Sequence, residues 1–179
     1  MKILILGIGN VMFSDEGVGV HLCHLMEEKY EFSSQEHTLD FIDGGTLAER
    51  LIPIIAEYDY VVVFDCVDAK GGKIGDVYFF DFEKIPESIT FQGSVHEVEM
   101  LQTLSMMDML GDRPPTKIIG IIPEVVSETT LHLSDKLITG TAIMERVFLK
   151  HMDKLGLKYQ LKQDIDIQSI ANKACAQFA

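Results

Sequence analysis

The chain has 179 residues, of which 47% are hydrophobic and 24% are charged, and its formal net charge is -13. This composition is typical of one ordinary globular domain and excludes a disordered, collagen-like or disulfide-stabilised protein. An excess of acidic side chains repels phosphate backbones and anionic lipid surfaces, so it argues against a nucleic-acid partner.

The cysteines and the N-terminus indicate the compartment. The chain has an odd number of cysteines and no CxxC motif; the three are Cys23, Cys66 and Cys175. This argues against a disulfide framework and against a structural zinc site. The first apolar run ends at Gly7, well short of a signal-peptide core, and no apolar stretch reaches the roughly 20 residues that span a bilayer. We therefore expect a cytoplasmic protein without membrane insertion.

Short apolar runs alternate along the chain with stretches of helical spacing. The runs predict strands over residues 3–6, 38–42, 60–64, 77–82 and 117–122. Helices are predicted from residue 14 or 15 onward, and over 95–110 and 133–152. The strand over 77–82 follows a short connection, which favours an antiparallel placement.

This alternation predicts the fold class. Strands that alternate with helices form a mostly parallel, twisted sheet with helices on both faces, here a single-domain three-layer α/β sandwich. Residues 1–154 are the predicted domain. Residues 155–179 form a C-terminal tail that we expect to be helical in part, because its apolar residues recur weakly at helical spacing.

Acidic side chains follow most of the predicted strands. Glu16 comes shortly after the first strand, Asp43 after the second, Asp65 directly after the third and Glu124 after the last. The carboxyl ends of parallel strands meet at one edge of the sheet, where ligands of such folds bind. These acids should therefore converge there, and His96, at the start of a predicted helix, can reach the same edge.

Glu16, Asp65 and His96 together offer two carboxylates and one imidazole with coordination positions left open. Such a set suits a divalent ion such as nickel or zinc and does not suit a closed structural site. Taken singly, each residue has a plainer interpretation: Glu16 offsets a helix dipole, Asp65 caps a helix or forms an ion pair, and His96 is structural.

Three alternatives start from neighbouring residues. Asp65 and Asp68 as a proton-sharing dyad would require one loop to supply both acids. Cys66 as a nucleophile with His96 as its base is less favoured than packing, because Cys66 directly follows a buried strand. A dinucleotide fingerprint fails at its third glycine, where Met12 stands.

Two glycines lie in the first turns of the first predicted helix. Gly17 and Gly19 each cost about 1 kcal/mol relative to alanine in a helix. Close approach of a partner or of another backbone would explain why the sequence keeps them.

The motifs in their order closely resemble the hydrogenase maturation proteases, the HybD-like endopeptidases. The resemblance extends from residue 2 to about residue 152 and rests on Gly7-Ile8-Gly9-Asn10, Asp15-Glu16-Gly17, Gly19-Val20, Asp43-Gly44-Gly45-Thr46, Asp65, His96 and Ile121-Ile122-Pro123-Glu124. It implies a nickel-dependent endopeptidase that removes the C-terminal extension of a [NiFe]-hydrogenase large-subunit precursor.

The resemblance also implies roles for individual residues. Glu16, Asp65 and His96 would contact nickel, which the precursor supplies and the enzyme does not hold tightly, although another divalent metal can occupy the site in vitro. A metal with open positions polarises a carbonyl or generates hydroxide, and Glu16 and Asp65 both remain open as the general base. Substrate-binding residues would be Gly9, Asn10, Asp43, Gly44, Gly45 and Thr46.

Two further alternatives remain at this point. A non-catalytic chaperone would use the acidic edge only to sense nickel and would leave the large subunit uncut, and a nucleotide-binding module would use the glycine loop instead. Separately, Met100, Met106, Met107 and Met109 lie at helical spacing, which favours core positions over an adaptable docking surface.

Overall fold

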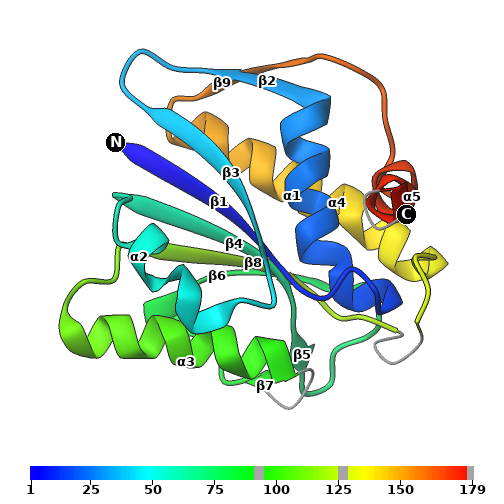
Figure 1. Ribbon diagram of the computed structural model, residues 1–179, viewed down its shortest axis with the longest axis horizontal. Coiled ribbons are helices and arrows are strands. Elements are labelled where there is room, and N and C mark those ends of the chain that lie inside the picture. The colour runs from blue at the N-terminus through cyan, green and yellow to red at the C-terminus, as the bar shows by residue number, and fades with distance from the viewer. Residues whose placement is uncertain (91–94, 125–128, 177–179) are drawn as a thin grey trace.

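A five-stranded sheet forms the centre of the molecule in the computed structural model (Figure 1). Its strands, in spatial order, are β3 (Thr38–Gly45), β1 (Lys2–Ile8), β4 (Tyr60–Cys66), β8 (Thr116–Ile121) and β6 (Val77–Asp81). The first four are parallel and β6 is antiparallel to β8, as its short connection predicted. The structure describes residues 1–90, 95–124 and 129–176, and the side chains of residues 90, 95–99, 175 and 176 lie outside this description.

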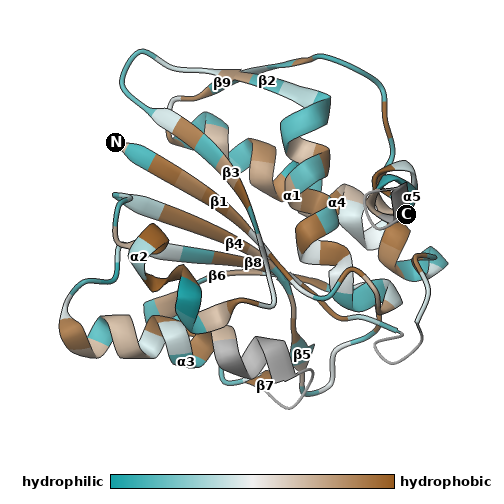
Figure 2. Ribbon diagram, viewed as in Figure 1, coloured by the Kyte–Doolittle hydropathy of each residue, from teal (hydrophilic) through white to brown (hydrophobic). Residues whose placement is uncertain are grey.

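Burial on both faces explains why the central strands have continuous apolar sequences. All residues of β1 after the first are buried, and so are all residues of β4 after the first. A hydrophobic core lies on each face of the sheet, and alternate side chains of β1 pack into one or the other. Ile3 and Ile5 belong to the first core, and Leu4 and Leu6 belong to the second. Figure 2 shows the resulting hydrophobic strands between helices with hydrophilic outer faces.

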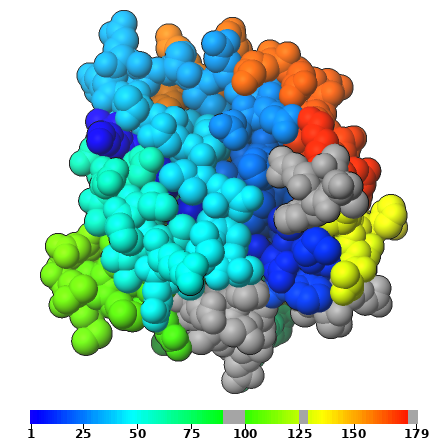
Figure 3. Space-filling view, viewed as in Figure 1, coloured from blue at the N-terminus to red at the C-terminus, as the bar shows by residue number. Residues whose placement is uncertain are grey.

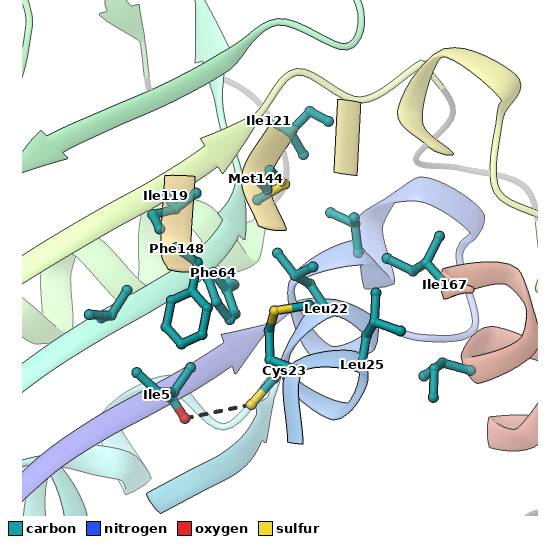
Figure 4. Packing of buried hydrophobic residues seen from close by; sticks show 14 of the residues in the cluster. Ile5, Leu22, Cys23, Leu25, Phe64, Ile119, Ile121, Met144, Phe148 and Ile167 are labelled. Atoms are coloured by element: carbon teal, nitrogen blue, oxygen red, sulfur yellow. Dashed lines mark hydrogen bonds between the residues drawn. The ribbon is translucent and has the colours of Figure 1, made fainter. Parts of the chain in front are cut away.

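Helices cover the two faces of the sheet (Figure 1). One face carries α1 (Val18–Lys29), α4 (Asp135–Lys154) and α5 (Ile167–Ala176). The other carries the short α2 (Ile52–Ile55) and the longer α3 (Val95–Leu110), so the predicted three-layer α/β arrangement is confirmed. Figure 4 shows the first core, where side chains of α1 and α4 meet the residues of β1, β4 and β8.

Short elements connect these layers. They are the 3-10 turns η1 (Ser14–Gly17), η2 (Ala48–Leu51) and η3 (Phe82–Lys84), and two ribbons in which β2 (Tyr30–Ser33) pairs with β9 (Lys158–Leu161) and β5 (Asp68–Ala69) pairs with β7 (Ile89–Thr90). The C-terminal tail therefore supplies a strand as well as the expected helix, and it buries Ile167, Ile170 and Ala171 in the first core. The boundary at residue 154 stays a prediction.

Two histidines one turn apart on α1 should make opposite contributions to stability in acid. Burial lowers the pKa of His21 to about 4, helped by the charge of His24 and opposed by Asp43. Its unfolded form takes up a proton near pH 6.5, so the folded state loses stability as the pH falls from 6.5 to 4. His21→Leu should remove this loss, worth about 2 kcal/mol, in denaturation curves measured at pH 7 and pH 4.5.

His24 provides the comparison. The hydrogen bond that His24 donates to the Asp43 carboxylate raises the pKa of His24, and Nε2 of His24 lies 3.3 Å from Oδ2 of Asp43. The contribution of His24 to stability is therefore fully present below the pKa that this side chain has in the unfolded chain. It is lost as the pH rises through the higher pKa of the folded state. His24→Leu should destabilise the protein most in acid, and equal pH profiles for the two variants would contradict this assignment.

Candidate active site

The loop that leaves β1 packs directly against the turn that carries Glu16. Gly9 has a φ of 137°, and a Cβ added there would lie 1.9 Å from the carbonyl oxygen of Glu16. The Gly9 amide donates to the Gly45 carbonyl at 3.0 Å, which joins this loop to the end of β3. Gly9 therefore lets two strand ends and η1 meet without a side chain between them.

Gly19 brings α1 against the ends of two strands. A Cβ at this position would lie 2.2 Å from the Phe64 carbonyl oxygen and 2.3 Å from that of Ile8. The close approach expected from the glycines of this helix is thus an approach of backbone to backbone. It sets the start of α1, and the turn before it, next to the carboxyl end of β4.

Glu16 and Asp65 meet at this edge of the sheet, as predicted. Both side chains are buried, with 5% and 7% of their residue surfaces exposed. The pKa of Asp65 is raised to about 8: burial is the main cause, a 2.8 Å hydrogen bond from the Cys66 amide opposes the shift, and the charge of Glu16 adds to it. Within the described part of the chain, the Glu16 carboxylate accepts no hydrogen bond, so its oxygens are available to a ligand.

The third predicted member of the set cannot be placed in the same way. His96 is the second residue of α3, and its side chain lies outside the described residues. Among the described side chains, no group of three or more histidines, cysteines, aspartates or glutamates is arranged to hold a metal ion. The metal role of Glu16, Asp65 and His96 therefore stays a prediction.

The two alternative catalytic pairs start from Asp68 and from Cys66. Asp68 lies in the β5–β7 ribbon, and the acid whose charge raises the pKa of Asp65 is Glu16. The Cys66 thiol is buried in the core on the α1 side and donates to the Asp15 carbonyl at 3.3 Å. Cys66 thus packs in the core, and its pairing with His96 stays untested because the His96 side chain lies outside the described residues.

The segment after β3 lies on the surface beside the start of α1. Asp43 accepts a hydrogen bond from the Gly45 amide at 2.9 Å, which shapes the turn, and its side chain is exposed, as is that of Thr46. Gly44 is buried against Leu6 and Ile8, where a Cβ would collide with both side chains. Figure 3 shows this segment, in cyan, adjoining the blue surface of the chain around the first helix.

Asn10 has a local structural role. Its side-chain oxygen accepts from the Met12 amide at 3.1 Å, and its carbonyl accepts from the Phe13 amide at 3.0 Å. These bonds form the turn between β1 and η1. Substrate binding by Asn10, or by the segment after β3, is left open by these contacts.

The larger clefts do not coincide with the acidic pair. The cavity beside Asp65 measures only about 10 Å³ in the described structure, whereas a groove of about 510 Å³ lies between η3 and the second half of α3. Met106 and Met109 line this groove with 43% and 87% of their surfaces exposed, and Met100 and Met107 are buried in the core. Core positions are thus confirmed for two of the four methionines, and docking by the two exposed ones stays a prediction.

The fold and the buried carboxylate pair define a three-layer α/β protein with a candidate site at the carboxyl edge of its parallel strands. Residues 20–149 match the hydrogenase maturation protease family. The chain belongs to this family, and it is a hydrogenase maturation protease.

Two curated relatives illustrate the similarity. The chain is 51% identical to protein HydD of Wolinella succinogenes over 85% of this chain and 96% of that protein. It is 29% identical to the hydrogenase 2 maturation protease of Escherichia coli over 69% of this chain and 74% of that one.

Solved structures support the fold. The hydrogenase maturating endopeptidase HybD of Escherichia coli matches with a TM-score of 0.78 and 24% identity, over 90% of this chain and 98% of that chain. The maturation protease HybD of Thermococcus kodakarensis matches with a TM-score of 0.65 and 23% identity, over 84% of this chain and 99% of that chain.

Proposed function

We propose that this protease removes the C-terminal extension of a [NiFe]-hydrogenase large-subunit precursor and that it acts only on a precursor that already carries nickel. Glu16, Asp65 and His96 contact that nickel in the proposed complex. The ion arrives with the substrate, so an enzyme without loaded precursor stays idle. Another divalent metal can take the same position in vitro.

The buried pair of carboxylates carries this proposal. Two acids from different elements lie together in an apolar setting, and burial, with a smaller contribution from the charge of Glu16, raises the pKa of Asp65 to about 8. A divalent ion between them would offset both effects and restore the charged form. Carboxylate oxygens with free lone pairs, joined by an imidazole, are ligands that nickel accepts.

The metal would polarise the carbonyl of the bond to be cut or supply hydroxide for its hydrolysis. Glu16 and Asp65 would hold the ion beside that bond, and the buried edge of the sheet would limit access of bulk water.

The peptide itself binds, in this proposal, along the loops that meet beside Glu16. These loops carry the proposed binding residues Gly9, Asn10, Asp43, Gly44, Gly45 and Thr46, of which Gly9 and Gly44 are buried. The hydrogen bond from Gly9 to Gly45 already joins the two loops, and the side chains of Asp43 and Thr46 are exposed on them. The glycines of these loops carry no side chain that would obstruct an extended peptide.

We place the reaction in the cytoplasm. Cys23 and Cys66 are both reduced cysteines buried in the core, which fits a reducing compartment. In the part of the chain that the structure describes, no helix has the length and apolar character needed to cross a membrane.

A processing assay tests the proposal. Purified protein is incubated with the unprocessed large subunit, loaded with nickel or free of it, and the mass of the large subunit is followed. We expect loss of a C-terminal peptide from the loaded precursor only, and no cleavage by the Glu16→Gln variant, whose amide is a much poorer metal ligand.

Two results would contradict the proposal separately. Equal cleavage of nickel-loaded and nickel-free precursor would remove the nickel requirement. Full activity of Glu16→Gln would remove this site from the reaction. Binding of a competent, loaded precursor without any change in its mass would instead support a chaperone.

A further inference from the structure

Asp15, the residue before Glu16, forms a connection between distant parts of the chain. Its side chain is completely buried. Its Oδ1 accepts from the Ser134 amide at 2.8 Å, and its Oδ2 accepts from the Ser134 hydroxyl at 2.8 Å and from the Glu124 amide at 2.9 Å. The carboxylate therefore joins η1 to the start of α4 and to the residues that follow β8.

Backbone contacts around Asp15 reinforce this connection. Ser14 has a φ of 48°, a conformation unusual for a residue with a side chain. Its amide donates to the Thr130 carbonyl at 2.7 Å and its hydroxyl donates to the His132 carbonyl at 2.5 Å. The Asp15 carbonyl accepts from the Cys66 thiol, which ties the same turn to the strand that carries Asp65.

We propose that Asp15 is a positioning residue for the reaction: its bonds to Ser134 and Glu124 hold η1 so that the adjacent Glu16 faces Asp65. A 3-10 turn of four residues has few internal hydrogen bonds to define its own orientation. A buried carboxylate that accepts three hydrogen bonds from two other segments supplies this orientation. The inference rests on the proposed function, in which Glu16 contacts the substrate's metal.

The chain offers a matched control for this role. Asp166 accepts from the Ser169 amide at 2.8 Å and from the Ser169 hydroxyl at 3.0 Å at the start of α5. Asp15→Asn and Asp166→Asn therefore make the same chemical change to an aspartate that accepts from the amide and the hydroxyl of one serine, although Asp15 is buried and Asp166 is exposed. Only the first lies beside the candidate site.

The experiment combines hydrogen–deuterium exchange of the free enzyme with kcat and KM for cleavage of nickel-loaded precursor. We expect Asp15→Asn to speed exchange at least tenfold in peptides covering η1 and the start of α4. It should lower kcat about 100-fold while KM changes by less than about threefold, because binding loops stay in place and only the reacting geometry is disturbed. Asp166→Asn should leave hydrogen exchange at η1 and at the start of α4 unchanged, and it should leave kcat and KM unchanged.

A milder variant covers the case in which Asp15→Asn fails to fold. Ser134→Ala removes the hydroxyl bond to Asp15 and also the N-cap bond that the Leu137 amide donates to this hydroxyl, but it keeps the Ser134 amide on Asp15. The decisive readouts for this variant are therefore exchange at η1 and kcat, and both should change in the same direction as in Asp15→Asn but by less. Wild-type kcat in whichever of these variants folds, or faster exchange at η1 without any fall in kcat, would overturn the positioning role. Wild-type activity of Glu16→Gln would instead refute the proposed site, and the exchange data would still show whether Asp15 orders η1.

Discussion

Asp65→Asn is expected to abolish cleavage of the precursor and, at the same time, to make the folded protein more stable at pH 8. The amide keeps the size of the side chain but loses its charge and one metal-binding oxygen, so cleavage should fall at least about 100-fold. The gain in stability follows from the cost of burying the carboxylate, whose pKa rises from 3.8 to about 8 in the fold.

The direction of the pH dependence follows from proton uptake. Between pH 3.8 and 8 the folded state holds a proton on Asp65 that the unfolded chain has released, so the folded state loses stability as the pH rises. At pH 8 the asparagine variant avoids this cost and should unfold with a free energy roughly 2 kcal/mol or more above that of the wild type. Below pH 3.8 both side chains are neutral and the difference should vanish.

Denaturant curves at pH 4 and pH 8, with a chelator present to remove stray metal, measure this difference beside the cleavage rate. Asp68→Asn is the matched control. It makes the same change to an aspartate three residues further along the chain, in the β5–β7 ribbon and not in the central sheet. That variant should keep cleavage within a few-fold of wild type. A destabilised Asp65→Asn at pH 8 would contradict the inferred cost of the buried charge.

The central sheet could be predicted because its sequence signal is local. Each of β1, β4 and β8 is buried on both faces, so it appears as an uninterrupted apolar run. The β2–β9 ribbon could not be predicted, because Tyr30 pairs with Leu161, a residue far away in the sequence, and both strands are only slightly buried. No local period indicates such a partner.

The candidate site was predictable to the same extent. Glu16 and Asp65 follow strands that lie side by side in the sheet, so parallel topology alone brings them to one edge. Asp15 was missed, because an acid in the first turn of a helix is usually explained by the dipole of that helix. The Asp15 carboxylate instead accepts a hydrogen bond from Ser134 at the start of α4. The sequence offered one indication of this contact site, because serine is a typical N-cap residue and Ser134 precedes α4.

Gly19→Ala is expected to lower the free energy of unfolding by at least about 3 kcal/mol, although alanine is the better helix former. The added Cβ would lie 2.2 Å and 2.3 Å from two carbonyl oxygens of β4 and β1. Both obstacles are backbone atoms of the central sheet, so neither can turn aside as a side chain could. The start of α1 must move away from the strands, and Glu16 moves with it.

Gly111→Ala separates this overlap from the ordinary cost of replacing a glycine. Gly111 has a φ of 77° and no heavy atom lies within 4 Å of an added Cβ, so only the backbone conformation opposes the change, at about 1 kcal/mol. Denaturant midpoints of both variants and their cleavage rates should be measured together. Gly111→Ala should stay active, whereas Gly19→Ala should lose both stability and cleavage. Equal midpoints for the two variants would show that α1 can shift freely, and Glu16 would then owe its position to contacts other than the packing of this helix on the sheet.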